Sequence, residues 1–138
     1  MPATPYFELD LKKLAFNYTE LKNKLTEVFE RNEIAYSIKT NSLPAIVQEL
    51  VHAGSGMEAA SLKELKTAVA AKAAAKTSFL VLNSPAKTPA EIRFAEKNHA
   101  LIHADSFQEL DILAKTVPKA RIGLRLNYGS NKFGFDGI

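Results

Sequence analysis

Hydrophobic and polar positions follow one another along the chain with two distinct periods. Between residues 11 and 28, apolar side chains recur three and four positions apart, which is the pattern of a helix with one buried face. Short apolar runs, such as FLVL from residue 79 and ALIHA from residue 100, are typical of strands. We therefore expect strands over 5–9, 34–39, 56–60, 79–82, 100–104 and 121–126. Helices are expected over 11–31, 44–53, 62–75, 89–98 and 107–115.

Three of these helices begin with the same signal, a Ser or Thr followed three positions later by Glu. The pairs are Ser61 with Glu64, Thr88 with Glu91, and Ser106 with Glu109. In such a capping box the hydroxyl and the carboxylate bind backbone N–H groups that the first helical turn leaves unpaired. Pro89 takes the first helical position, where its missing N–H costs nothing. The helix starts are therefore predicted from local chemistry as well as from periodicity.

The alternation of strand and helix predicts the fold class. No hairpin signals separate the strands, so we expect parallel strands joined by right-handed crossovers, in a doubly wound sheet or a (β/α)₈ barrel. In 34–39 and 121–126, bulky apolar residues alternate with small or polar ones. Barrel strands carry polar groups on the inward face near their carboxyl ends, whereas a doubly wound sheet is apolar on both faces. We predict an α/β fold, a partial TIM (β/α)₈ barrel of about five parallel βα units after a short N-terminal strand and helix.

Composition removes several classes of function. The 138 residues contain no cysteine, which excludes disulfides and thiolate chemistry, and the three histidines lack metal-ligand spacing. The net charge of +3 is mild and its lysines are explained by solvated helix faces, so no nucleic-acid partner is expected. No apolar run reaches the length of a membrane span. We expect a cytoplasmic protein.

One lysine lies where barrel enzymes place catalytic groups. In AYSIKTN (35–41), alternation puts Ala35, Ser37 and Lys39 on the inward face, with Lys39 at the carboxyl end of the strand. An ammonium withdrawn from water there loses proton affinity and becomes a usable nucleophile. A lysine that extends out of the barrel mouth into water is the alternative.

Six segments, in order along the chain, resemble the pyridoxal-phosphate-dependent amino-acid decarboxylases of the alanine racemase fold (fold-type III), the group of diaminopimelate, ornithine and lysine decarboxylases. AYSIKTN is similar to the family's Y-A-V-K-A-N, and GMEAASLKEL to its F-D-x-A-S-x-x-E-L, with Glu58 in place of the usual aspartate. NSPAKT resembles N-P-x-K, HADS resembles V-D-S, and LRLN with NKFGF resembles R-x-N and S-K-F-G. The opening TPYFELDLKKLAFNY also resembles the family's first strand and helix.

The resemblance implies roles for four residues. Lys39 would be the Schiff-base lysine of pyridoxal 5'-phosphate, and Arg125 would lie beside the cofactor's ring hydroxyl, or else pair with a barrel carboxylate. Glu58 would pair with Lys39 or tune its proton transfer, and its longer arm leaves that role open. Ser37 would make room for the ring, or only pack. The implied activity is decarboxylation of a basic or dibasic amino acid.

The resemblance leaves other functions open and implies missing parts. A racemase or a pyridoxal-phosphate-binding homeostasis protein of the same barrel, or a non-catalytic module, are alternatives. Residues 1–138 would form the N-terminal part of the barrel, with its remaining strands and a C-terminal β domain absent, and the full-length protein would be a homodimer with active sites at its interface. His103 is inward by alternation and is expected to be a hydrogen-bonded core histidine or a substrate contact. Asn131, Lys132 and Phe133 are expected in a loop at the barrel mouth.

Overall fold

The computed structural model describes residues 4–72 and 79–126. Helices and strands alternate along the described chain, as the hydrophobic pattern predicts. The strands are β1 Ala35–Ser37, β2 Gly56–Ala59, β3 Leu80–Leu82, β4 Leu101–Ala104 and β5 Ile122–Leu124. The α-helices are α1 Leu11–Val28, α2 Pro44–His52, α3 Leu62–Lys72, α4 Pro89–Lys97 and α5 Phe107–Thr116, and a 3₁₀ helix, η1 Ile38–Thr40, follows β1 directly.

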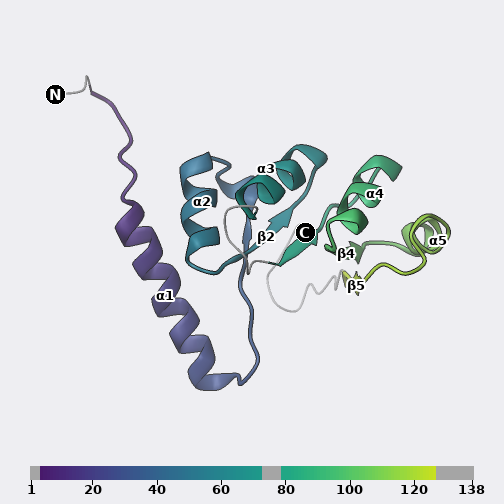
Figure 1. Cartoon of the computed structure of the whole chain (residues 1–138), viewed down its shortest axis with the longest axis horizontal. Coiled ribbons are helices and arrows are strands. Elements are labelled where there is room, and N and C mark those ends of the chain that lie inside the picture. The colour runs from purple at the N-terminus through teal and green to yellow at the C-terminus, as the bar shows by residue number, and fades with distance from the viewer. Residues whose placement is uncertain (1–3, 73–78, 127–138) are drawn as a thin grey trace, which may run out of the picture.

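The five strands form one parallel sheet in the order β1-β2-β3-β4-β5. The strand order in the sheet follows the order along the chain, and an α-helix connects each strand to the next (Figure 1). A doubly wound sheet reverses its strand order at a switch point, and the described strands show no such reversal. The predicted barrel-type βα units are therefore confirmed.

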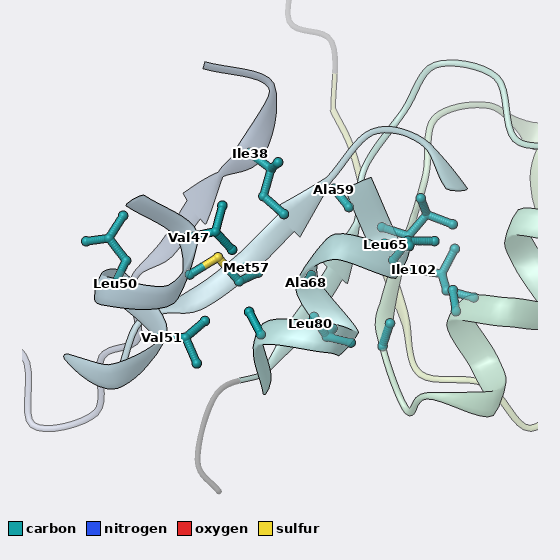
Figure 2. Close-up of a cluster of buried hydrophobic side chains, with 14 of the residues drawn as sticks. Ile38, Val47, Leu50, Val51, Met57, Ala59, Leu65, Ala68, Leu80 and Ile102 are labelled. Carbon is teal, nitrogen blue, oxygen red and sulfur yellow. The ribbon is translucent and has the colours of Figure 1, made fainter. Parts of the chain in front are cut away.

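The hydrophobic core lies between one face of the sheet and the helices α2 to α5. On β2, β3 and β4 every second residue contributes to it: Met57, Leu82 and Ile102 are completely buried, and Figure 2 shows Met57 among Val47 and Val51 of α2. Full burial of a side chain of this size stabilises the fold by about 1.5–3 kcal/mol. The core strand residues are thus the outward face of the predicted barrel, and their neighbours in sequence lie on the inward face.

Helix α1 lies to one side of the sheet and packs on α2 (Figure 1). Asp10 caps it by accepting a hydrogen bond from the Lys13 backbone N–H at 2.9 Å. Tyr18 is its one buried residue, while Phe16 and Leu21 are more than half exposed. The helix ends at Val28 rather than at residue 31, because the backbone turns extended at the next residue.

Two strand predictions need correction. Residues 5–9 do not form a strand: Phe7 is fully exposed, and no strand in the described part of the chain pairs with this segment. An apolar extended segment becomes a strand only where a neighbour supplies hydrogen bonds. The strand predicted over 34–39 ends at Ser37, because the chain winds into η1. Lys39 therefore lies in a tight turn after the strand, not in the strand itself.

Candidate functional site

The inward face of the sheet carries a polar cluster across its first three strands. Ser37 and Glu58 are partners in the β1–β2 register, and the Ser37 Oγ donates a hydrogen bond to Glu58 Oε1 at 3.0 Å. The Asn83 Nδ2, just after β3, donates to Glu58 Oε2 at 3.2 Å. Glu58 thus connects the carboxyl ends of three parallel strands. This edge of a barrel is where enzymes of the fold place their catalytic groups.

A second polar pair lies at the same edge, beyond β4 and β5. The Arg125 Nε lies 3.3 Å from Asp105 Oδ1, and the Arg125 backbone N–H donates to the Ala104 carbonyl at 2.8 Å. The two side chains form an ion pair, but their geometry is not that of a hydrogen bond. Asp105 Oδ1 is buried and accepts no hydrogen bond from the described residues. Arg125 thus pairs with a barrel carboxylate, which was the alternative to a position beside the ring hydroxyl of the cofactor. About a third of the Arg125 side chain (34%) is exposed and accessible from the edge.

His103 lies on the inward face of β4, over the backbone of β5. Gly123 is its register partner, and a Cβ added to Gly123 would lie 2.4 Å from the imidazole Cδ2. The glycine therefore provides the space that the ring occupies. No described residue forms a hydrogen bond with the imidazole, so the expected hydrogen-bonded core histidine is not what this part of the structure contains.

Lys39 is exposed, which corrects the expectation of a desolvated ammonium. The turn that carries it is held by its neighbours: the Thr40 Oγ1 donates to the Ser37 carbonyl at 2.7 Å, and the Tyr36 hydroxyl donates to the Asn41 carbonyl at 3.0 Å. Within the described residues Lys39 forms no ion pair, and the two Glu58 oxygens accept hydrogen bonds from Ser37 and Asn83. The structure thus brings Ser37 and Glu58 together, and it keeps Lys39 and Arg125 out of that contact.

The described sheet also separates the two polar groups. Three strand spacings of about 4.8 Å each lie between β2, which carries Glu58, and β5, which precedes Arg125. Both side chains are on the inward face, opposite the buried row that includes Met57 and Ile102. Asn131, Lys132 and Phe133 lie outside the described residues.

Sequence reasoning missed the positions of Asn83 and Asp105 at this edge, and the contact between Lys87 and Glu109. Asn83 stands two positions after Val81, so strand alternation could have placed it on the same face as Glu58. Asp105 is found in the same way from His103. Lys87 and Glu109 are 22 positions apart in sequence, so no local sequence pattern predicts their contact.

Two further properties of the described part concern metal binding and membrane spans. No group of three or more His, Asp or Glu side chains in residues 4–72 and 79–126 could hold a metal ion. None of the helices in these ranges is long and apolar enough to cross a membrane.

Comparison with known proteins identifies the fold and its cofactor. The family described as "Pyridoxal-dependent decarboxylase, pyridoxal binding domain" matches residues 17–136. The chain belongs to this family. The resemblance drawn from the six sequence segments is confirmed, and so is pyridoxal phosphate as the cofactor of the pyridoxal-binding decarboxylase domain.

Individual relatives agree with this assignment. The chain is 36% identical over 102 residues to the uncharacterized protein y4yA of Sinorhizobium fredii, covering 74% of this chain and 22% of the relative. It is 31% identical over 122 residues to the diaminopimelate decarboxylase of Campylobacter jejuni, covering 81% and 30%. The crystal structure of the diaminopimelate decarboxylase from M. jannaschi superposes with a TM-score of 0.75 at 26% identity, covering 90% and 30%. The chain therefore spans less than a third of the length of these relatives.

The inward edge of this pyridoxal-binding decarboxylase domain fits the chemical needs of its cofactor. An aldehyde needs a primary amine, and Lys39 presents one in an exposed turn. A ring hydroxyl needs a cation, and Arg125 is partly exposed at the same edge. Asn83 Oδ1 is buried without a hydrogen-bond partner among the described residues, as expected of a group with room for a further donor.

Proposed function

We propose that the protein containing this chain is a pyridoxal-phosphate-dependent decarboxylase of a basic or dibasic amino acid, to which residues 1–138 contribute the N-terminal part of the cofactor-binding barrel. The observation that carries the proposal is the position of Lys39, in the exposed turn directly after β1 and next to the Ser37–Glu58 pair. The relative whose name specifies diaminopimelate supports the class of amino acid.

Each residue of the edge has a definite task in this proposal. Lys39 would hold the cofactor through its amine and give it up to the amine of the substrate. The Arg125 guanidinium would stabilise the ring hydroxyl in its ionised form. The bound cofactor supplies a ring that accepts the electrons of the bond broken in the substrate.

Glu58 and Ser37 have supporting tasks. Glu58 is held by Ser37 and Asn83, so its charge is fixed at the edge next to the turn of Lys39, where it tunes proton movement at the Lys39 amine. Ser37 is small enough to leave room above the strand. The proposal also includes a homodimer with active sites at its interface. It places the protein in the cytoplasm, a location with which the absence of cysteine in this chain agrees.

Borohydride reduction of the full-length protein loaded with cofactor tests the role of Lys39. Reduction makes the covalent link permanent, and peptide mass spectrometry should find the pyridoxyl group on Lys39. Lys87 is a matched internal control, since its side chain is completely buried in an ion pair. A label on Lys87 or Lys132, with Lys39 unmodified, would overturn the assignment.

Substitution of Lys39 separates chemistry from folding. Lys39→Ala and Lys39→Arg should both lose the label and nearly all release of carbon dioxide, because a guanidinium stays protonated and cannot attack an aldehyde. Since Lys39 is exposed, Lys39→Ala should change the free energy of unfolding by no more than about 0.5 kcal/mol. Racemisation of the amino acid without release of carbon dioxide would replace decarboxylation as the activity.

A further inference from the structure

A buried ion pair lies at the same edge of the sheet as the candidate site, and the proposed chemistry gives it no task. The Lys87 Nζ donates to Glu109 Oε2 at 2.8 Å and to the Ser84 carbonyl at 2.6 Å. The Lys87 side chain is 0% exposed and that of Glu109 is 8% exposed. Two charges withdrawn from water this far are a weak source of stability, because desolvation offsets their attraction. The pair therefore invites an explanation beyond stability.

The ion pair is connected to Arg125 through Asp105. The Glu109 Oε2 that accepts from Lys87 also accepts from the Asp105 backbone N–H at 2.8 Å. The Asp105 carboxylate in turn lies 3.3 Å from the Arg125 Nε. One continuous series of contacts thus runs from the loop before α4, through the first turn of α5, to the residue just after β5.

The contacts of Glu109 go beyond helix capping. Glu64 stands at the equivalent position of α3 and accepts a hydrogen bond from the Ala60 backbone N–H, also at 2.8 Å. Its own backbone N–H donates to Ser61 Oγ, as that of Glu109 does to Ser106 Oγ. In the described part of the chain, however, Glu64 has no lysine partner. A capping glutamate alone needs no buried cation, so the contact between Lys87 and Glu109 has a reason beyond helix capping.

We propose that the Lys87–Glu109 ion pair is a positioning device that fixes Asp105 and, through it, the guanidinium of Arg125. Lys87 holds the Glu109 carboxylate in one orientation, and that carboxylate holds the backbone of Asp105. The Asp105 side chain then restrains an arginine that is otherwise partly exposed and free to adopt several rotamers. Lys87 and Glu109 are positioning residues, and their effect on the cofactor rests on the proposed function of Arg125.

The first test uses the full-length protein without cofactor. The NMR resonance of the Arg125 Nε–H reports the surroundings of the guanidinium directly. Lys87→Met should shift that resonance, and Glu64→Gln, the matched capping control, should not. An unchanged resonance in folded Lys87→Met protein would overturn the proposal, and this readout does not depend on any role of the cofactor.

The second test measures the dissociation constant of pyridoxal phosphate by absorbance titration. Lys87→Met should weaken binding about tenfold, the effect of losing one hydrogen bond to a charged group. It should weaken binding no further in an Arg125→Met background, because it acts through that residue. Losses that multiply would mean that Lys87 acts independently of Arg125, contrary to the proposal.

The outcomes separate this inference from the proposed function. If Arg125→Met leaves the dissociation constant unchanged while Lys87→Met still shifts the Arg125 resonance, the cofactor role of Arg125 fails and the positioning device stands. If Lys87→Met does not fold, Glu109→Gln decides, because it keeps an oxygen for the Asp105 N–H and loses only the charge. A folded Glu109→Gln protein with unchanged resonance and unchanged affinity would overturn the device.

Discussion

At the scale of single residues, two glycines on either side of Ser55 are required for different reasons. Gly54 ends the loop after α2 with a φ of +93°, which side chains disfavour, and a Cβ there would meet nothing within 4 Å. Gly56 begins β2, and a Cβ there would lie 2.3 Å from the Cε1 of the Phe79 ring. One position therefore needs glycine for its backbone and the other for its surroundings.

This difference predicts which substitution can be rescued. Gly54→Ala should cost about 1–2 kcal/mol of unfolding free energy through its backbone, and Gly56→Ala about 1–3 kcal/mol through overpacking. Repeating both in a Phe79→Ala background, by urea unfolding, should remove most of the Gly56→Ala loss and none of the Gly54→Ala loss. Equal losses at Gly56 with and without the Phe79 ring would contradict the assignment.

At the scale of elements, the capping glutamates tie neighbouring βα units together. Glu91 accepts from the Thr88 N–H and hydroxyl, both at 2.8 Å, as the capping box predicts. Its other oxygen accepts from the Leu62 N–H at 3.0 Å, at the start of the previous helix. Glu109 reaches back in the same way to Lys87. These contacts fix the loops at the carboxyl edge of the sheet relative to one another, which a cofactor site on several strands requires.

The contacts of Glu91 predict a dependence of stability on pH. Burial alone would raise the pKa of this carboxyl, but the hydrogen bonds from Thr88 and Leu62 and the charge of Lys87 outweigh it, so the pKa lies below its usual 4.5. A depressed pKa in the folded state stabilises the protein above the unfolded pKa, and the contribution is lost as pH falls through the folded pKa. Glu91→Gln should therefore be less stable than wild type at pH 7, by about 1 kcal/mol.

The measurement for Glu91 is the free energy of unfolding from pH 7 down to pH 3. The difference between wild type and Glu91→Gln should be constant down to about pH 5. It should shrink below 4.5, where the carboxylate of the unfolded chain takes up its proton, and be lost once pH has passed the lower pKa of the folded state. A difference that grows as pH falls would show that the sign is wrong.

The elements also show how far sequence alone could go. The helix starts at Ser61, Thr88 and Ser106 are predicted because capping is a contact within four residues, and all three hydroxyls accept the expected hydrogen bond. The inward position of Glu58 follows from strand alternation in the same local way. The N-terminal strand over 5–9 could not be judged, because strand formation depends on a neighbour distant in sequence.

The candidate site was predicted less completely than the fold. The alternation of apolar and polar residues continues through Lys39 and predicts that it belongs to the strand. In the structure a 3₁₀ helix, held by hydrogen bonds from Thr40 and Tyr36, replaces the strand at this position. The pairing of Arg125 with Asp105 joins elements that are separated by a whole helix. Sequence patterns report the face on which a side chain lies, but not its partner on that face.

At the scale of the whole molecule, β5 is the strand at the end of the described sheet, paired with β4 alone among the described strands. Its outward residues are apolar and exposed: Ile122 is 38% exposed, Leu124 65% and Leu126 85%. Leu124 and Leu126, together with Phe107 of α5, line a groove of about 560 Å³. The equivalent row on β3, which includes Leu80 and Leu82, is buried under helices.

An exposed apolar row beside a strand edge that pairs with no described strand predicts self-association of the 138-residue chain when it is expressed alone. Sedimentation velocity over a range of concentrations should show dimers or larger species. Leu124→Lys should weaken this association at least tenfold, because a charge in the row has to be desolvated on contact, at a cost of about 1.4 kcal/mol or more. Folding should be little affected, since Leu124 is mostly exposed.

The matched control for this prediction is Val28→Lys, at the end of α1, where the side chain is 73% exposed but lies on another element. It carries the same change of charge and removes a similar apolar side chain, so it should leave the association constant unchanged. A chain that stays monomeric at all concentrations would show that the edge is not adhesive. Equal weakening by Val28→Lys and Leu124→Lys would attribute the association to net charge rather than to the β5 row.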